Sequence, residues 1–131
     1  RTPMPWQAQD EFGGFSGDEP WLPLGSENLS RAVDRQEADP ASLLNLTRDL
    51  LALRNRHAAL RQGRVVQCEA VGALLVLDRA CAGEQLRGLF NISDQAIVLT
   101  AEQAQGEVVM AINDAEGTTL PPFGALLLRR P

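Results

Sequence analysis

The sequence predicts a mixed α and β fold, in which an irregular loop precedes a leucine-rich helix and an antiparallel β-sandwich follows the helix. Two observations predict the regular part. Leucines recur at helical spacing between Asp39 and Gly63, and six short apolar or alternating runs, separated by turn residues, follow Gly63. The length of 131 residues suits one domain, or one domain with an extension.

The first 25 residues are expected to form a long irregular loop. Prolines and glycines interrupt any helical or strand period there, yet the segment also contains both tryptophans, Trp6 and Trp21. Structureless loops longer than about 12–15 residues are usually functional or disordered, and disordered segments normally contain few aromatic residues. We therefore expect this loop to pack against another part of a protein.

The helix is predicted to begin at Asp39, which would be its N-cap, and to end at Gly63. Proline at the position after Asp39 suits the first helical turn, and glycine is a common stop signal. At about 100° per residue, the leucines cover an arc of roughly 200°, which exceeds the stripe of about 100° that a surface helix needs. We expect this helix to be covered from two sides. A short helical turn is expected earlier, near Val33.

Six strands are predicted after the helix, and their spacing of about 8–12 residues is typical of an antiparallel sandwich or barrel. They span residues 64–70, 73–79, 85–91, 96–100, 107–113 and 123–130. Glycines at Val71-Gly72 and Ala82-Gly83 mark two of the turns between them. Phe123 is expected to belong to the core.

Composition excludes several classes of protein. No run approaches the roughly 18 apolar residues needed to cross a bilayer. A net charge of −5 with scattered arginines argues against a nucleic-acid or anionic-membrane partner. Two cysteines are too few for a disulfide scaffold. We expect a soluble globular chain with no metal and no cofactor.

The two cysteines are expected to be free and mostly buried. Neither Cys68 nor Cys81 has the spacing of a zinc ligand. In a hairpin turning at Val71-Gly72, Cys68 would face a residue near position 74, so a disulfide to Cys81 is disfavoured.

No complete active site is visible, and no residue of this chain is assigned a catalytic role. The only histidine, His57, lacks the nearby nucleophile and orienting carboxylate of a catalytic histidine, and a structural role near the helix end is expected. The acidic pairs Asp10-Glu11 and Asp18-Glu19 lie on a glycine-rich loop. Glycoside hydrolysis needs two carboxylates at a fixed separation on rigid supports, so we expect these to be solvated or capping groups.

Several stretches of the sequence carry a resemblance, in order and with matching spacing. They are RTPMPW at residues 1–6, GFS at 14–16, PWLP at 20–23, DPASLL at 39–44, LRNRHAAL at 53–60, LFNISD at 89–94 and LPPFGAL at 120–126. Together they resemble the C-terminal part of the α-glucosidases of glycoside hydrolase family 13, the α-amylase family.

The resemblance implies the end of a (β/α)8 barrel followed by an antiparallel Greek-key β-sandwich. Residues 1–62 would be the terminal loop and last helix of the catalytic barrel, and residues 63–131 the C-terminal β-domain. The helix would then pack between barrel and sandwich. Ala58 stands where the family usually has proline, which should let the helix run one turn further.

The resemblance also implies a function. The parent protein would be an α-glucosidase that hydrolyses terminal non-reducing α-linked glucose by a retaining mechanism. The family's catalytic carboxylates lie upstream, so this chain alone is expected to be inactive. Arg1 matches a substrate-binding arginine that contacts glucose near the −1 subsite. Pro5 and Gln7, where the commonest motif has glutamine and aspartate, resemble bacterial enzymes that act on short maltose-type substrates.

The expected partners are an α-glucoside or oligosaccharide substrate, in the intact enzyme, and the missing N-terminal barrel. The fragment is also expected to self-associate. Location is not readable from the residues, although the resemblance to bacterial α-glucosidases favours the cytoplasm. A stand-alone β-sandwich interaction or carbohydrate-binding module, and a related transglucosylase or sucrose isomerase, stay open as alternatives. The linkage preference and the ratio of hydrolysis to transfer also stay open.

Overall fold

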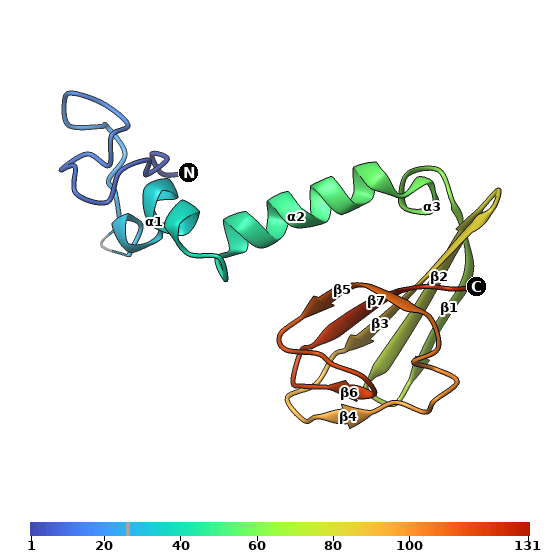
Figure 1. Cartoon of the computed structure of the whole chain (residues 1–131). Helices are drawn as coiled ribbons and strands as arrows, with labels where there is room; N and C mark the ends of the chain where they lie inside the picture. Colours follow the sequence, from blue (N-terminus) through green and yellow to red (C-terminus); the bar gives the residue numbers. More distant parts are fainter. Residues whose placement is uncertain (26) are drawn as a thin grey trace. The chain divides into compact units, whose positions relative to one another are not determined.

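A computed structural model of the chain describes residues 1–25 and 27–131 (Figure 1). The chain divides into two compact units, Arg1–Leu53 and Arg54–Pro131. The first unit contains the irregular loop and then, in order, the 3-10 turn η1 (Leu29–Arg31), helix α1 (Val33–Ala38) and most of helix α2 (Leu43–Arg56). The second unit contains the end of α2, helix α3 (Ala58–Arg61) and the strands.

Helix α2 begins later than the sequence predicts, because Ser42 and not Asp39 caps it. The Ser42 hydroxyl oxygen accepts the backbone N–H of Asn45 at 3.2 Å. The Asp39 carboxylate instead accepts the N–H of Ala41 at 2.9 Å, in a turn of its own. Local hydrogen bonds of this kind compete with helix formation, so the prediction of Asp39 as the N-cap is wrong.

The predicted helix is also interrupted at His57, whose backbone is extended (φ −108°, ψ 115°). The expectation that Ala58 lets the helix run one turn further is therefore wrong. His57 Nδ1 lies 2.6 Å from Glu84 Oε1, and the N–H of Ala59 donates to Glu84 Oε2 at 2.8 Å. These contacts hold the backbone out of helical geometry. Gly63 does end the helical region, since a Cβ there would collide with the carbonyl oxygen of Ala59.

Two antiparallel sheets form the β unit. The larger has the strand order β1-β2-β3-β7-β5, and the smaller pairs β4 with β6. Their bounds are β1 (Arg64–Val71), β2 (Leu74–Cys81), β3 (Glu84–Asn91), β4 (Ile97–Val98), β5 (Glu107–Ile112), β6 (Thr119–Leu120) and β7 (Ala125–Arg129). Within the described residues, each of the six predicted strands is present. Strand β6 was not predicted, because two residues before a proline pair show no period.

The core of the β unit lies between the two sheets. Its buried apolar residues come from both sheets and from the connections beside them: Leu74, Val76, Leu89, Leu99, Ala115, Leu120, Leu126 and Leu128. Strand β7 pairs with β3 on one side and with β5 on the other, so the chain leaves the larger sheet after β3 and returns to it at β5 and β7. The predicted fold class, mixed α and β with an antiparallel sandwich, is confirmed.

The hairpin of β1 and β2 turns one residue later than predicted. Gly72 adopts φ 59° and Val71 pairs with Leu74, so Cys68 faces Leu77 and not a residue near 74. Both cysteines are free, but Cys68 is exposed on the outermost strand, and the expectation that it is mostly buried is wrong.

Phe123 is exposed, so its assignment to the core is also wrong. Its φ of 54° places it in a turn before β7. Its N–H donates to the Ser93 carbonyl at 3.0 Å, and its own carbonyl accepts from Asn113 Nδ2 at 3.0 Å. Backbone hydrogen bonding, and not ring burial, therefore fixes this position.

The register of each outermost strand of the larger sheet is interrupted once. Strand β1 shifts its pairing with β2 between Val65 and Gln67, and β5 shifts its pairing with β7 between Val108 and Met110. Such shifts are characteristic of β-bulges, which occur often at sheet edges.

Candidate functional site

Arg1 lies at a small hollow in the loop of the first unit, with a volume of about 150 Å³. The hollow is lined by Arg1, Thr2, Pro3, Phe15, Pro20, Trp21 and Leu22. Arg1 is exposed, and Trp21 is 92% exposed. A guanidinium beside exposed aromatic side chains has the chemistry of a sugar-binding surface, because the cation binds hydroxyl groups and aromatic faces pack on sugar rings.

Hydrogen bonds of Asp10 and Asp34 hold the loop. Asp10 accepts the backbone N–H groups of Phe12 and Gly14 at 2.9 and 2.8 Å. Gly14 adopts φ 66°, a conformation that favours glycine. Asp34, in the first turn of α1, accepts the N–H of Ala8 with both carboxylate oxygens at 3.1 and 3.0 Å. Asp10 is thus a capping group, as expected, and the loop is irregular but internally ordered.

The aromatic residues of the loop, which were expected to pack, are largely exposed. Trp6 and Phe15 are each about half exposed, like Met4. Helix α2 shows the same feature, since Leu43, at 72% exposed, and Leu51 lie open while Leu53 is buried. The first unit therefore presents apolar surface on both its loop and its helix.

His57 has the structural role that the sequence indicates. Its side chain is buried, and its only described hydrogen-bond partner is Glu84, at the start of β3. The backbone N–H of Ala59, and next the hydrogen bond from His57, lower the pKa of Glu84 below its ordinary value. No nucleophile among the described residues accompanies this pair, so it lacks the third member of a catalytic triad.

A buried ion pair crosses β2 and β3. Asp78 and Arg87 face each other in register, and two hydrogen bonds of 2.9 and 2.8 Å join the guanidinium to the carboxylate. This pairing raises the pKa of Arg87. The pair lies among core residues, where a bidentate contact satisfies both charges. We assign it a structural role.

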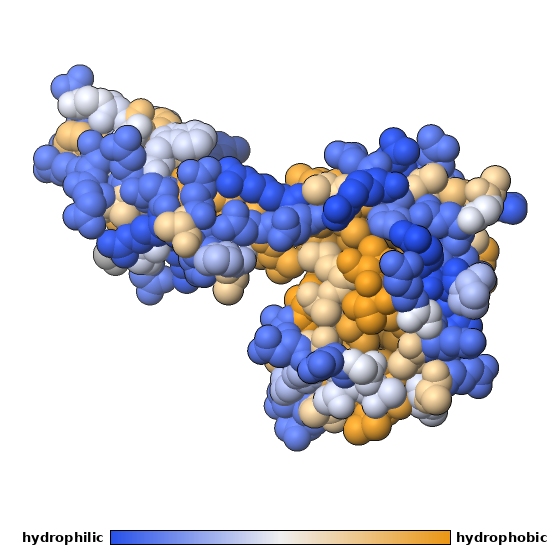
Figure 2. All heavy atoms as spheres, in the orientation of Figure 1, coloured by the Kyte–Doolittle hydropathy of each residue, from blue (hydrophilic) through white to orange (hydrophobic). Residues whose placement is uncertain are grey.

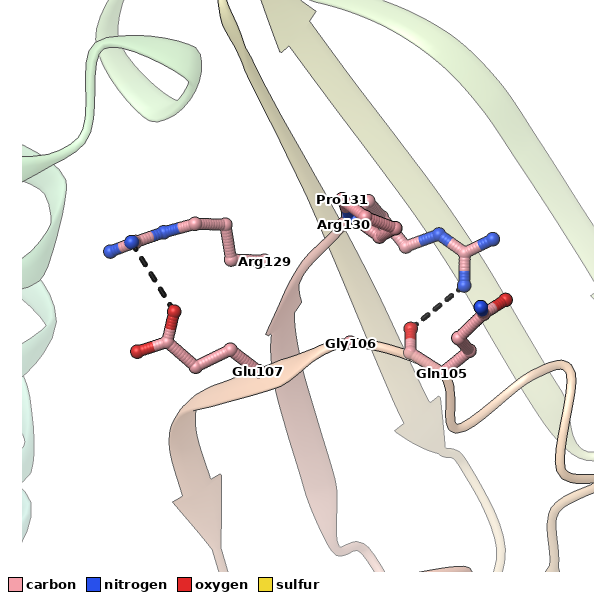
Figure 3. Close-up of a pocket in the computed structure, with 6 residues that line it drawn as sticks. All are labelled: Gln105, Gly106, Glu107, Arg129, Arg130 and Pro131. Atoms are coloured by element: carbon pink, nitrogen blue, oxygen red, sulfur yellow. Dashed lines mark hydrogen bonds and ion pairs between the residues drawn. The ribbon is translucent and has the colours of Figure 1, made fainter.

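A second hollow, of about 260 Å³, lies where β5 begins and β7 ends (Figure 3). Arg129 and Glu107 form an exposed ion pair of 3.2 Å at its wall, and Arg130 donates to the carbonyl of Gln105 at 2.8 Å. Both arginines are thus engaged with protein atoms.

Among residues 1–25 and 27–131, no group of three or more histidine, cysteine or acidic side chains is placed to hold a metal ion. No helix in this part of the chain is both long and apolar enough to span a bilayer.

Glu84 and Arg79 are the important polar residues that the sequence did not indicate. Each belongs to a strand with an ordinary alternating pattern, and its partner lies more than 15 positions away in sequence. The sequence signal for Glu84 is its position directly after the turn at Ala82-Gly83, where it pairs with Cys81.

Comparison with known proteins identifies related sequences. Residues 1–63 match the family described as Alpha amylase, catalytic domain. A probable alpha-glucosidase of Rhizobium meliloti (strain 1021) is 39% identical over 98% of this chain and 24% of that protein. The trehalose-6-phosphate hydrolase of Escherichia coli (strain K12) is 28% identical over 93% of this chain and 22% of that protein. The chain thus spans about a quarter of the length of these relatives.

Solved structures share the fold. The isomaltulose synthase PalI from Klebsiella sp. LX3 superimposes with a TM-score of 0.83 at 22% identity, over 98% of this chain and 24% of that one. The trehalulose synthase MutB from Pseudomonas mesoacidophila MX-45 gives a TM-score of 0.80 at 20% identity, over 98% of this chain and 25% of that one. At these identities the likeness concerns the fold alone.

Proposed function

This chain belongs to the α-amylase family, glycoside hydrolase family 13, and from that premise we propose that it is the C-terminal part of an α-glucosidase. The whole protein would hydrolyse terminal non-reducing α-linked glucose by the two-carboxylate retaining mechanism. The observation that carries this proposal is the 39% identity to a probable alpha-glucosidase, which extends over 98% of the chain.

Within that protein, residues 1–62 would form the last loop and helix of the catalytic barrel, and residues 63–131 the C-terminal β-domain. Two observations support this division. The match to the catalytic-domain family ends at residue 63, and β1 starts at Arg64. The chain itself would then have a structural role and no turnover of its own.

The remainder of the barrel is the partner that we propose for the exposed apolar surfaces. On α2, Leu43, Leu50 and Leu51 are exposed. The outer face of the larger sheet, opposite the core, carries the partly buried side chains of Leu75, Leu77, Phe90, Met110 and Leu127. A hydrophobic area is visible on the β unit in Figure 2. Contiguous apolar surface of this kind is typical of an interface.

Arg1 would bind the substrate in the intact enzyme. Its exposure, and its place at a hollow lined by Phe15 and Trp21, support this role. The planar guanidinium holds hydroxyl groups with a geometry that an ammonium group does not reproduce. In the whole protein, Arg1→Lys should lower kcat/KM by about tenfold or more. Arg31→Lys, at an exposed arginine paired with Glu27, is the matched control and should have no effect.

The test compares the complete gene product with the 131-residue chain. The complete protein should release glucose from maltose, with the α-anomer appearing first, and the chain alone should not hydrolyse p-nitrophenyl α-glucoside. Isomaltulose or trehalulose formed from sucrose would instead support a sucrose isomerase, whose fold this chain shares. Release of the β-anomer would contradict the retaining mechanism.

A carbohydrate-binding module is the second candidate, and one observation bears on it. Phe123 is exposed on the β unit, in a turn and not on a strand. A lone ring forms a small platform for a sugar. Binding of maltose by the chain, abolished by Phe123→Ala, would favour this candidate.

A further inference from the structure

Residues 57–63 are held on the β unit by two side chains from neighbouring strands. Glu84 of β3 accepts the N–H of Ala59 at 2.8 Å and contacts His57 Nδ1 at 2.6 Å. Arg79 of β2 donates to the carbonyls of Ala59 and Gly63 at 3.0 and 2.6 Å. Ala59 is completely buried, and both of its backbone polar groups are bound by side chains of the sheet. We call this arrangement the α3 clamp.

Hydrogen bonds to charged groups contribute much of this attachment. Helix α3 has four residues, of which only Ala59 is buried. An alanine side chain has little apolar area, so its burial contributes little free energy. A helix of one turn is not stable by itself. The charge-assisted bonds of Glu84 and Arg79 therefore hold the segment in place.

Glu84 is the acidic residue of the clamp, so the strength of its hydrogen bonds depends on whether its carboxyl group is ionised. The groups that face it are His57 and the N–H of Ala59, with Arg79 on β2 and Arg129 on β7 nearby. Arg129 is itself paired with an exposed glutamate of β5. The Ala59 N–H, His57 and Arg129 all favour the ionised carboxylate. A protonated carboxyl group accepts two hydrogen bonds less well, because one of its oxygens then carries the proton and acts as a donor. The attachment is therefore complete at neutral pH.

The sign of the pH effect follows from the lowered pKa of Glu84. A carboxyl group whose pKa is lower in the folded protein stabilises it above the ordinary carboxyl pKa, and this contribution is lost as the pH falls through the lowered value. The residues of the apolar core cluster have no titratable side chain, whereas the larger sheet also contains the buried Asp78–Arg87 pair. Acid should therefore weaken the attachment that Glu84 makes to residues 57–63.

We propose that Glu84 is an acid-sensitive latch: its ionised form holds residues 57–63 on the sheet, and its protonation loosens this segment, which Arg79 alone then holds. This device is independent of the proposed enzymatic activity, because it depends only on contacts within the second unit.

Amide hydrogen exchange of the 131-residue chain tests the latch. At near-neutral pH, Glu84→Gln should accelerate exchange of the Ala59 and Gly63 amides by about tenfold, the loss of a hydrogen bond to a charged acceptor. Amides in the β2–β3 ladder should be unchanged, and the control Glu116→Gln, at an exposed glutamate, should change nothing. In acid, where Glu84 itself is protonated, the difference between wild type and Glu84→Gln should disappear.

Unchanged exchange at Ala59, equal acceleration throughout the sheet, or a difference that persists undiminished in acid would each overturn the proposal. If Glu84→Gln does not fold, the wild-type chain provides the test. The side-chain carboxyl signal of Glu84 and the Ala59 amide should then report one shared acid midpoint. Separate midpoints for Glu84 and Ala59 would overturn the proposal.

Discussion

Removal of one partner of the Asp78–Arg87 pair should strongly destabilise the β unit. Asp78 is only 2% exposed, and the Arg87 guanidinium, bound to both of its carboxylate oxygens, also contacts Gln67 Oε1 at 3.3 Å. Loss of one member leaves a buried charge without its partner, which costs about 3–5 kcal/mol. A unit of roughly 80 residues has a stability of about 4–12 kcal/mol. Asp78→Asn or Arg87→Met should thus abolish a large share of it.

Urea unfolding of the full chain, followed by circular dichroism in the strand region, measures this effect. The double variant Asp78→Leu/Arg87→Met should recover most of the loss, since apolar replacement of both members is often neutral or stabilising. Glu107→Gln is the matched control, because Glu107 and Arg129 are also paired across two strands, at 3.2 Å, but exposed. It should cost at most about 1 kcal/mol. If Asp78→Asn and Glu107→Gln lower the free energy of unfolding by the same small amount, the argument that burial sets the cost of losing a charged partner is refuted.

Three further changes have defined outcomes. Gly63→Ala should lower the thermal midpoint measurably, because its Cβ would meet the carbonyl oxygen of Ala59; an unchanged midpoint would show that the segment adjusts freely. Asn91→Ala should cost about 1–3 kcal/mol in urea unfolding, since its buried amide donates to three backbone carbonyls, and a loss below about 0.5 kcal/mol would contradict this. Leu43→Gln combined with Leu51→Gln should lower self-association in sedimentation velocity without changing helix content; unaltered sedimentation would exclude α2 as the contact.

The sequence was most informative where a local pattern determines the structure. Turn residues and alternation located the β strands to within a few residues, and Gly63 marked the end of the helical region because only glycine tolerates the approach of a carbonyl there. Prediction of the backbone conformation failed where it is determined by a side chain that is distant in sequence. The break at His57 depends on Glu84, 27 positions away, and no local signal announces it.

The candidate site, too, could be predicted only in part, because it combines a residue with a local motif and residues that are brought together by the fold. The resemblance singled out Arg1, and the structure adds the neighbouring Trp21 and Phe15, which sequence spacing could not place at one hollow. In the α-glucosidase that we propose, the catalytic carboxylates would lie outside these residues, so this chain alone would not complete the site. The role of Arg1 and the division of the chain at residue 62 stay predictions.

The interrupted pairing at Val65 in β1 and at Val108 in β5 has a consequence for how copies of this chain can meet. Bulges twist an outer strand and break the regular ladder of free backbone groups that an incoming strand would need. Fibril growth by strand addition is therefore obstructed at both rims of the sheet. Any assembly of copies should use side-chain surfaces, and should form closed, finite complexes more readily than polymers.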